Sequence, residues 1–208
     1  MFQRILALSP HTDDAELGCG GTLSRFIEEG KDVYYVALSS CEKSIPDSYR
    51  MDILRKEVEE ATKILGLPEE NLLVLGYEVR HFPRMRQEIL DTLIRIRDKY
   101  KPDLVLTPSL HDLHQDHKTT TEEALRAFRT SSILGYELPW NNITFDTLAF
   151  VLLEERHVKK KIEALKCYQS QSHRKYLNEE YITSLARSRG VQIGKEYAEV
   201  FEVMRWII

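Results

Sequence analysis

Cysteine is scarce in this sequence, and its spacing offers no pairing. Cys19, Cys41 and Cys167 are three in 208 residues, and none belongs to a C-x-x-C pair. An odd, widely spaced set predicts neither a disulfide framework nor a zinc site built from thiolates. We therefore expect a protein of a reducing compartment, the cytoplasm.

Long apolar runs and an excess of positive charge are missing as well. No segment approaches the roughly 18 apolar residues of a membrane span, and the start lacks the features of a secretory signal, so we expect no stable membrane anchor. Lys and Arg number 29 against 33 Asp and Glu, which gives a net charge of −4. The basic run Lys159-Lys160-Lys161 falls in a helical pattern and is typical of a solvated helix face. This balance argues against a nucleic-acid partner.

The chain does contain short apolar runs that alternate with longer helical patterns. Apolar residues make up 42% of the sequence, enough for the core of one large domain. Four strand-then-helix units predict a parallel sheet with helices on both faces. The last third predicts strands that extend the same sheet and allows an antiparallel edge. The expected strands are 5–8, 33–38, 72–75, 104–106, 147–153 and 200–208, and the expected helices are 23–29, 51–65, 84–100, 120–128, 156–167 and 179–189.

The predicted fold class is therefore α/β, as a single domain over residues 1–208. We expect a Rossmann-like, mostly parallel sheet with helices on both faces and a C-terminal strand extension. No repeat, low-complexity tract or linker-like segment marks a domain boundary.

Two clusters of metal-ligand side chains follow two of the predicted strands. The first is Pro10-His11-Thr12-Asp13-Asp14, and the second is His114-Gln115-Asp116-His117. Because loops at the carboxyl ends of neighbouring parallel strands line one crevice, these side chains should meet there. Two imidazoles and a carboxylate, with another carboxylate beside them, are the parts of a catalytic zinc site with an open position. The sequence therefore predicts a metal-dependent hydrolase.

Spacing alone leaves the ligand set open. Asp13 and Asp14 are adjacent, so their side chains diverge, which favours one carboxylate on the metal and the other on the attacking water. The alternative is that one of them caps the following helix. Histidines recur every three residues from His111 to His117 and form two overlapping H-x-x-H pairs. Asp116 either orients an imidazole or faces solvent.

A glycine-rich segment, Gly18–Gly21, follows the first cluster. Glycines permit close backbone approach, and a helix that they open would point its amide-rich end into the crevice. A dinucleotide fingerprint needs G-x-G-x-x-G directly after the strand, whereas these glycines begin ten residues after Leu8. The mismatch argues against a dinucleotide site. A non-enzymatic α/β module that binds a nucleotide or a sugar remains the alternative to an enzyme.

The two clusters together resemble the LmbE-like (PIG-L) family of zinc-dependent N-deacetylases. The resemblance rests on SPHTDDAELGCGGT from Ser9 to Thr22 and on HQDH from His114 to His117, and it extends over most of the chain. That family removes acetyl groups from N-acetylglucosamine units on lipid, thiol-precursor or other glycoside carriers. The resemblance implies a hydrolase of linear amides that acts on a small-molecule N-acetylated sugar conjugate and, by analogy, a homo-oligomer (trimer or hexamer). Hydrolysis of another N-acyl amide is the nearest alternative.

The resemblance also implies a role for each matching residue. Zn²⁺, or Fe²⁺ or Co²⁺ in its place, would be bound by His11, Asp14 and His117. Asp13 would be the general base, and a protonated His114 would stabilise the oxyanion.

The chain departs from the commonest family pattern at several positions. Thr12 replaces a usual proline and Ala15 stands where glutamate is common, and neither supplies metal or proton. The carboxylate that family members use to hold sugar hydroxyls has no clear match, and Glu78 is a weak candidate. Arg55 is a better candidate for a sugar contact, with a helix-surface charge as the equal alternative. Asp116 would support the metal ligands from a second shell.

Overall fold

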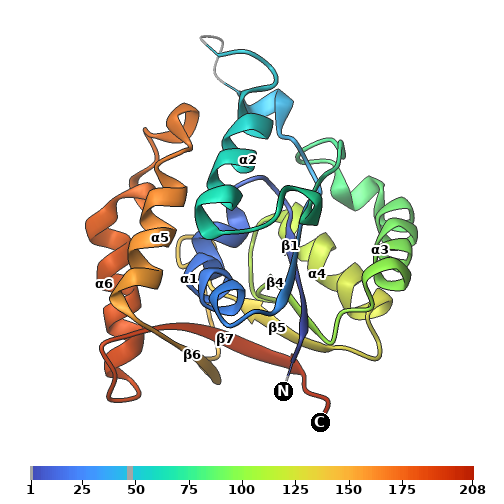
Figure 1. Ribbon diagram of the computed structural model, residues 1–208. Helices are drawn as coiled ribbons and strands as arrows, with labels where there is room; N and C mark the ends of the chain where they lie inside the picture. Colours follow the sequence, from blue (N-terminus) through green and yellow to red (C-terminus); the bar gives the residue numbers. More distant parts are fainter. Residues whose placement is uncertain (1, 46–48) are drawn as a thin grey trace.

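The computed structural model describes residues 2–45 and 49–208, and within them one mixed sheet is flanked by helices (Figure 1). The strands are β1 (Arg4–Ser9), β2 (Asp32–Ala37), β3 (Leu72–Val74), β4 (Leu104–Pro108), β5 (Ser132–Tyr136), β6 (Ala149–Leu153) and β7 (Tyr197–Arg205). The helices are α1 (Asp14–Glu28), α2 (Ile53–Leu65), α3 (Arg86–Tyr100), α4 (Gln115–Ala127), α5 (Glu155–Leu165) and α6 (Glu179–Val191). Short 3₁₀ turns are η1 (Glu42–Ser44), η2 (Glu69–Asn71), η3 (Phe82–Arg84), η4 (Gln169–Gln171) and η5 (Lys175–Leu177).

The strand order is β3-β2-β1-β4-β5-β7-β6. The first five strands pair in parallel, and β7 is antiparallel to both β5 and β6. The α/β fold class with a C-terminal extension of the sheet is thus confirmed. The antiparallel strand lies one position in from the edge, which is formed by β6.

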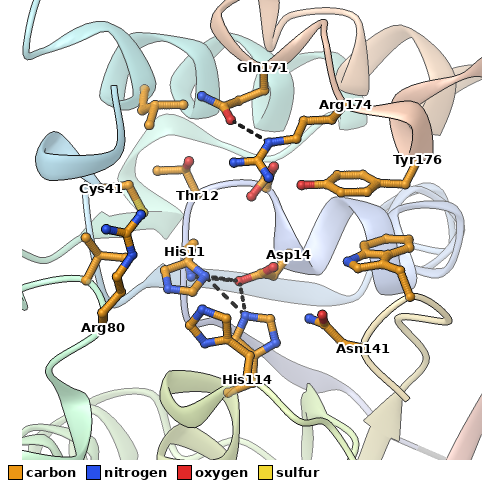
Figure 2. A pocket seen from close by; sticks show the side chains of 15 residues that line it. His11, Thr12, Asp14, Cys41, Arg80, His114, Asn141, Gln171, Arg174 and Tyr176 are labelled. Carbon is orange, nitrogen blue, oxygen red and sulfur yellow. Dashed lines mark hydrogen bonds and ion pairs between the residues drawn. The ribbon is translucent and has the colours of Figure 1, made fainter. Parts of the chain in front are cut away.

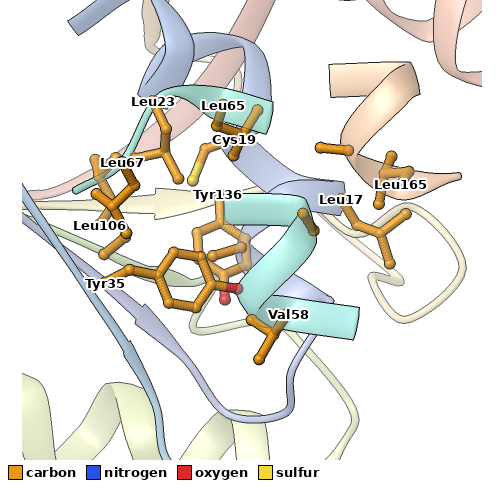
Figure 3. Close-up of a cluster of buried hydrophobic side chains, with 14 of the residues drawn as sticks. Leu17, Cys19, Leu23, Tyr35, Val58, Leu65, Leu67, Leu106, Tyr136 and Leu165 are labelled. Carbon is orange, nitrogen blue, oxygen red and sulfur yellow. The ribbon is translucent and has the colours of Figure 1, made fainter. Parts of the chain in front are cut away.

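The apolar side chains of β1 alternate between two cores. Ile5 and Ala7 face a cluster with α1, α2 and α5, while Leu6 and Leu8 face a cluster with α3 and α4. All four side chains are fully buried, as expected for a strand covered on both faces. In Figure 3, Tyr35 and Tyr136 lie among the aliphatic side chains of the first cluster. The carboxyl end of this strand is therefore held rigidly, which matters for the residues that follow it.

One strand was not predicted, and the predicted starts of two helices were wrong. Strand β5 was missed because it is short and carries Gly135, where a Cβ would lie 2.4 Å from the Met204 side chain. A glycine in a strand marks such a close approach. Helix α1 begins at Asp14 and not near Leu23, and α4 begins at Gln115 and not near Thr120. The polar residues expected in loops after β1 and β4 thus form the first turns of helices.

The glycine-rich segment lies inside α1, whose backbone departs from helical geometry at Cys19. A Cβ at Gly18 would lie 2.1 Å from the Tyr136 ring, and one at Gly21 would lie 2.6 Å from Leu153. The amides of Gly21 and Thr22, freed by the irregularity at Cys19, donate to the buried carboxylate of Glu199 at 3.1 and 2.6 Å. These glycines permit packing, and the amides that could have held a phosphate already bind a carboxylate, so the predicted nucleotide cradle is not formed.

Across the part of the chain that the structure describes, no helix has both the length and the hydropathy that a bilayer crossing requires.

Candidate active site

The two polar clusters meet where β1 and β4 end. These strands are hydrogen-bonded neighbours in the centre of the sheet, so the segment 11–14 after β1 and the segment 114–117 after β4 emerge side by side. Figure 2 shows His11, Asp14 and His114 around one space, with dashed lines between the interacting groups. The parallel strand order therefore brings together residues about a hundred positions apart in sequence.

Three ligand atoms form a nearly equilateral triangle. His11 Nδ1 lies 3.0 Å from Asp14 Oδ2, and His117 Nε2 lies 3.1 Å from both atoms. Around a tetrahedral zinc ion, bonds of roughly 2.0–2.1 Å would place such atoms about 3.3 Å apart. A wider group made of the imidazoles of His11, His114 and His117 has its ligand atoms within 4.8 Å. The tighter set, two imidazoles and a carboxylate, fits one small cation better.

Two buried carboxylates fix which nitrogen of each imidazole faces that triangle. Asp116 Oδ2 lies 3.1 Å from His11 Nε2, and Asp112 Oδ2 lies 2.7 Å from His117 Nδ1. An imidazole nitrogen beside a carboxylate carries the proton, so the lone pairs of the other two nitrogens point into the triangle. Lone pairs that converge at about 3 Å need a cation between them, so the donor set suits a metal.

The electrostatics of the cluster also favour an added positive charge. Burial alone would lower the pKa of His117, but the carboxylates of Asp14 and Asp112 outweigh it and raise the pKa to about 10. Burial acts to raise the pKa of Asp14, yet the two imidazoles beside it hold that pKa well below its usual value. The site thus attracts a proton or, in its place, a metal cation.

Asp13 is placed differently from Asp14, although the two are adjacent. Its side chain lines the cavity beside the ligand triangle. Burial, and then the charge of Asp14, raise the pKa of Asp13 to about 6. A carboxyl with a pKa close to neutrality is suited to accept and return a proton.

His114 is the N-cap of α4, and its role is set by that position. Its Nδ1 accepts a hydrogen bond of 3.2 Å from the backbone N–H of Asp116. The proton of the neutral ring therefore lies on Nε2, the nitrogen available to a ligand in the cavity. Burial and the two other imidazoles lower the pKa of His114 to about 4. The resemblance implies a protonated His114, whereas a ring with a pKa lowered in this way would be neutral near pH 7 and would donate from Nε2; its protonation state stays a prediction.

A buried polar network stabilises the turn at residues 11–14, which carries His11 and Asp14. The hydroxyls of Tyr35 and Tyr168 lie 3.0 and 2.6 Å from the carbonyl oxygen of Thr12, and each is also within hydrogen-bond distance of the Glu16 carboxyl. Burial raises the pKa of Glu16 to about 8. Tyr168 lies 156 residues from Thr12 along the chain, so no local sequence signal could identify it.

A cavity of about 270 Å³ opens in front of the cluster. That volume is close to the lower end of the range for small-molecule sites, about 300–1,000 Å³. Its wall includes Trp140 stacked on Tyr176, with ring centroids 4.1 Å apart. The lining residues are His11, Thr12, Asp13, Asp14, Cys41, Leu54, Val79, Arg80, His114, His117, Trp140, Asn141, Gln171, Arg174 and Tyr176.

Three residues singled out in the sequence lie outside this lining. Arg55 is exposed on α2, and its guanidinium donates to the carbonyl oxygen of Val74, so it is not placed to touch a sugar in the cavity. Glu78 forms a surface ion pair with Lys43. His111 is half exposed and approaches Glu202 at 3.9 Å. The structure instead lines the cavity with Arg80 and Arg174, for which the sequence carried no motif.

Comparison with known proteins agrees with this site. A family model for PIG-L, described as GlcNAc-PI de-N-acetylase, matches residues 6–128, which is more than half of the chain and includes both ligand clusters. The chain belongs to the PIG-L family. The matched range includes the residues of the ligand triangle, and it also includes Asp13, His114 and the two carboxylates of Asp112 and Asp116 that contact the imidazoles.

Two curated relatives carry names of deacetylases. The Escherichia coli (strain K12) protein named "Uncharacterized deacetylase YaiS" is 30% identical over 171 residues, which cover 80% of this PIG-L chain and 90% of YaiS. The diacetylchitobiose deacetylase of Thermococcus kodakarensis is 30% identical over 125 residues, 56% of this chain. The second match covers 45% of the archaeal enzyme, so more than half of that enzyme lies outside it.

Solved structures share the fold over almost the whole chain. The N,N'-diacetylchitobiose deacetylase of Pyrococcus horikoshii superposes with a TM-score of 0.80 at 23% identity, over 98% of this chain and 84% of that one. GalB of Pseudomonas putida KT2440, a 4-carboxy-2-hydroxymuconate hydratase, superposes with a TM-score of 0.79 at 23% identity, over 99% of this chain and 98% of GalB. A deacetylase and a hydratase thus share this fold, so the reaction of this PIG-L member has to be argued from its site.

Proposed function

We propose that this chain is a metal-dependent hydrolase that removes the acetyl group from an N-acetylated amino sugar, leaving acetate and a free amine. The observation that carries the proposal is the ligand triangle of His11, Asp14 and His117, with Asp13 and His114 beside it. The family match and the deacetylase names of both relatives support the same reaction.

The metal would be held by His11, Asp14 and His117, with Asp116 and Asp112 orienting the two imidazoles. At a site of two imidazoles and a carboxylate, Zn²⁺ (or Fe²⁺ or Co²⁺) supplies Lewis acidity toward a carbonyl oxygen and lowers the pKa of water.

The remaining chemistry belongs to two side chains. Asp13 takes a proton from the water as the oxygen of that water attacks the acetamide carbon. His114 donates from Nε2 to the carbonyl oxygen as negative charge develops there. Asp13 then returns the proton to the amine nitrogen when the carbon–nitrogen bond breaks, so that one water is consumed and one amine and one acetic acid form, and the acid ionises to acetate.

Hydrolysis of another N-acyl amide is the alternative that uses the same groups. The cavity favours a sugar because its wall carries the Trp140–Tyr176 pair and the polar side chains of Asn141 and Gln171. An aromatic face with a few polar groups suits a ring that has both apolar C–H faces and hydroxyls.

Metal content and acetate release together test the proposal. The purified protein should contain about one divalent metal per chain by mass spectrometry. It should release acetate from N-acetylglucosamine or N,N'-diacetylchitobiose, and not from an N-acetylated amino acid. His117→Ala should lose metal and activity together.

Asp146→Asn is the control, because the Asp146 side chain is exposed and does not line the cavity. A fully active protein without metal, or a metal-free but active His117→Ala variant, would overturn the proposal. The cytoplasmic location and the trimeric or hexameric assembly stay predictions.

A further inference from the structure

Arg80 has an unusual backbone conformation next to the metal ligands. Its φ is +70°, in the left-handed region that favours glycine. Two hydrogen bonds with the segment 114–117 fix this conformation. The Arg80 N–H donates to Asp116 at 2.5 Å, and the Arg80 carbonyl oxygen accepts from the side chain of Gln115. The carboxylate that receives the Arg80 amide is the one that orients His11. A strained non-glycine residue locked to a catalytic centre points to a function for its side chain.

The Arg80 side chain lines the cavity, and Figure 2 shows it on the wall beside Cys41 and His11. Arg174 lines the same cavity from another wall, where its Nε donates to Gln171 at 3.3 Å. Among the described residues, neither guanidinium forms an ion pair with a carboxylate.

Several other arginines of this chain form ion pairs with carboxylates. Arg189 forms an ion pair with Glu137, Arg86 with Glu123, and Arg156 with Glu28. Among residues 2–45 and 49–208, the carboxylates that line the cavity are Asp13 and Asp14, and both belong to the metal site. Within the described part of the wall, two guanidinium groups are therefore left without an ion-pair partner.

On these grounds we propose that Arg80 is a specificity-determining residue that binds an oxyanion of the substrate, so that the preferred N-acetylated sugar carries a phosphate or carboxylate. The guanidinium presents a planar fork of donors that matches either group. Arg174 adds a second positive charge to the same cavity. This inference rests on the proposed function for the acetamide part of the substrate, while the anion site itself is independent of the chemistry.

Substitution by glycine provides a clean test. Arg80→Gly removes the guanidinium and places the residue that best accepts a φ of +70°, so the variant is expected to fold. Binding is measured by calorimetry on the protein as purified, with the deacetylated sugars glucosamine, glucosamine 6-phosphate and muramic acid, which the enzyme does not hydrolyse.

The wild-type protein should bind one anionic sugar, phosphate or carboxylate, roughly 10- to 100-fold more tightly than glucosamine, the effect of a charged hydrogen bond. Arg80→Gly should abolish that preference and leave the affinity for glucosamine unchanged. Arg129→Gln is the control, since Arg129 is exposed beyond the C-terminal end of α4, whose N-terminal end carries the histidines, and it should keep the wild-type preference.

Equal affinity of the wild-type protein for the neutral and both anionic sugars would overturn the inference, as would a preference that survives in Arg80→Gly. The outcomes also separate the two proposals. Acetate release from neutral N-acetylglucosamine with no anion preference would refute the anion site alone. An anion preference that depends on Arg80, in a protein that deacetylates no sugar, would refute the deacetylase alone.

Discussion

Replacing Asp112 by Asn should weaken metal binding although Asp112 touches no metal in this scheme. Its Oδ2 lies 2.7 Å from His117 Nδ1, and its Oδ1 accepts the backbone N–H of His114 at 2.7 Å. Both oxygens of the carboxylate are therefore acceptors. An amide offers one acceptor and one donor, so it cannot satisfy both partners.

Either orientation of the new amide costs a hydrogen bond. If its oxygen keeps the His114 amide, its NH₂ faces His117 Nδ1 and drives the imidazole proton to Nε2, the atom that faces the metal. If the oxygen keeps His117, two N–H groups face each other. The loss of one hydrogen bond to a charged, buried group is about 1.5–3 kcal/mol, which agrees with the 10- to 100-fold in metal affinity typical of such second-shell changes.

The assay is a zinc titration in competition with a chromophoric chelator, run on wild type, Asp112→Asn and the exposed control Asp146→Asn. We expect a zinc Kd about 10- to 100-fold weaker in Asp112→Asn and unchanged in the control, with both variants folded by circular dichroism. An unchanged Kd in Asp112→Asn would show that the Asp112–His117 contact does not set the tautomer.

Four further outcomes follow from the same geometry. Asp13→Asn should keep its metal by mass spectrometry and lose roughly 10²- to 10⁴-fold in kcat; loss of metal would make Asp13 a ligand instead. Because Asp13 has a pKa of about 6 and acts as its base form, kcat/KM should fall as pH drops through a value at or below about 6, and an acid limb above pH 7 would contradict that. Glu199→Gln leaves the Lys161 ammonium buried without its partner at 2.7 Å and should cost about 3–5 kcal/mol in urea unfolding, whereas Glu155→Gln in the exposed Lys159 pair should leave the urea midpoint almost unchanged. Gly18→Ala, whose Cβ would lie 2.1 Å from Tyr136, should lower stability by about 1–3 kcal/mol, while Gly76→Ala, with nothing within 4 Å, should not.

Much of the fold could be predicted because the information was local. The apolar run at Ile5–Leu8 is surrounded on both faces in any parallel sheet, so it indicates a buried strand without knowledge of its partners. Strand β5 carries no such pattern, because Gly135 is required by the approach of Met204 and Ser109. The start of α4 was misplaced for a similar reason, since histidines and an acid at a helix N-terminus resemble a loop until the cap at His114 is seen.

The sequence by itself determined the types of the candidate ligands and their positions at strand ends, and the family resemblance singled out His11, Asp14 and His117 among them. Tertiary structure alone decided which carboxylate supports which imidazole and placed Arg80 and Arg174 in the cavity wall. The physical reason is distance along the chain. A motif records residues that are neighbours in sequence, whereas pKa values, tautomers and the charge of a cavity depend on groups that only the packing of the sheet and helices brings within a few ångströms.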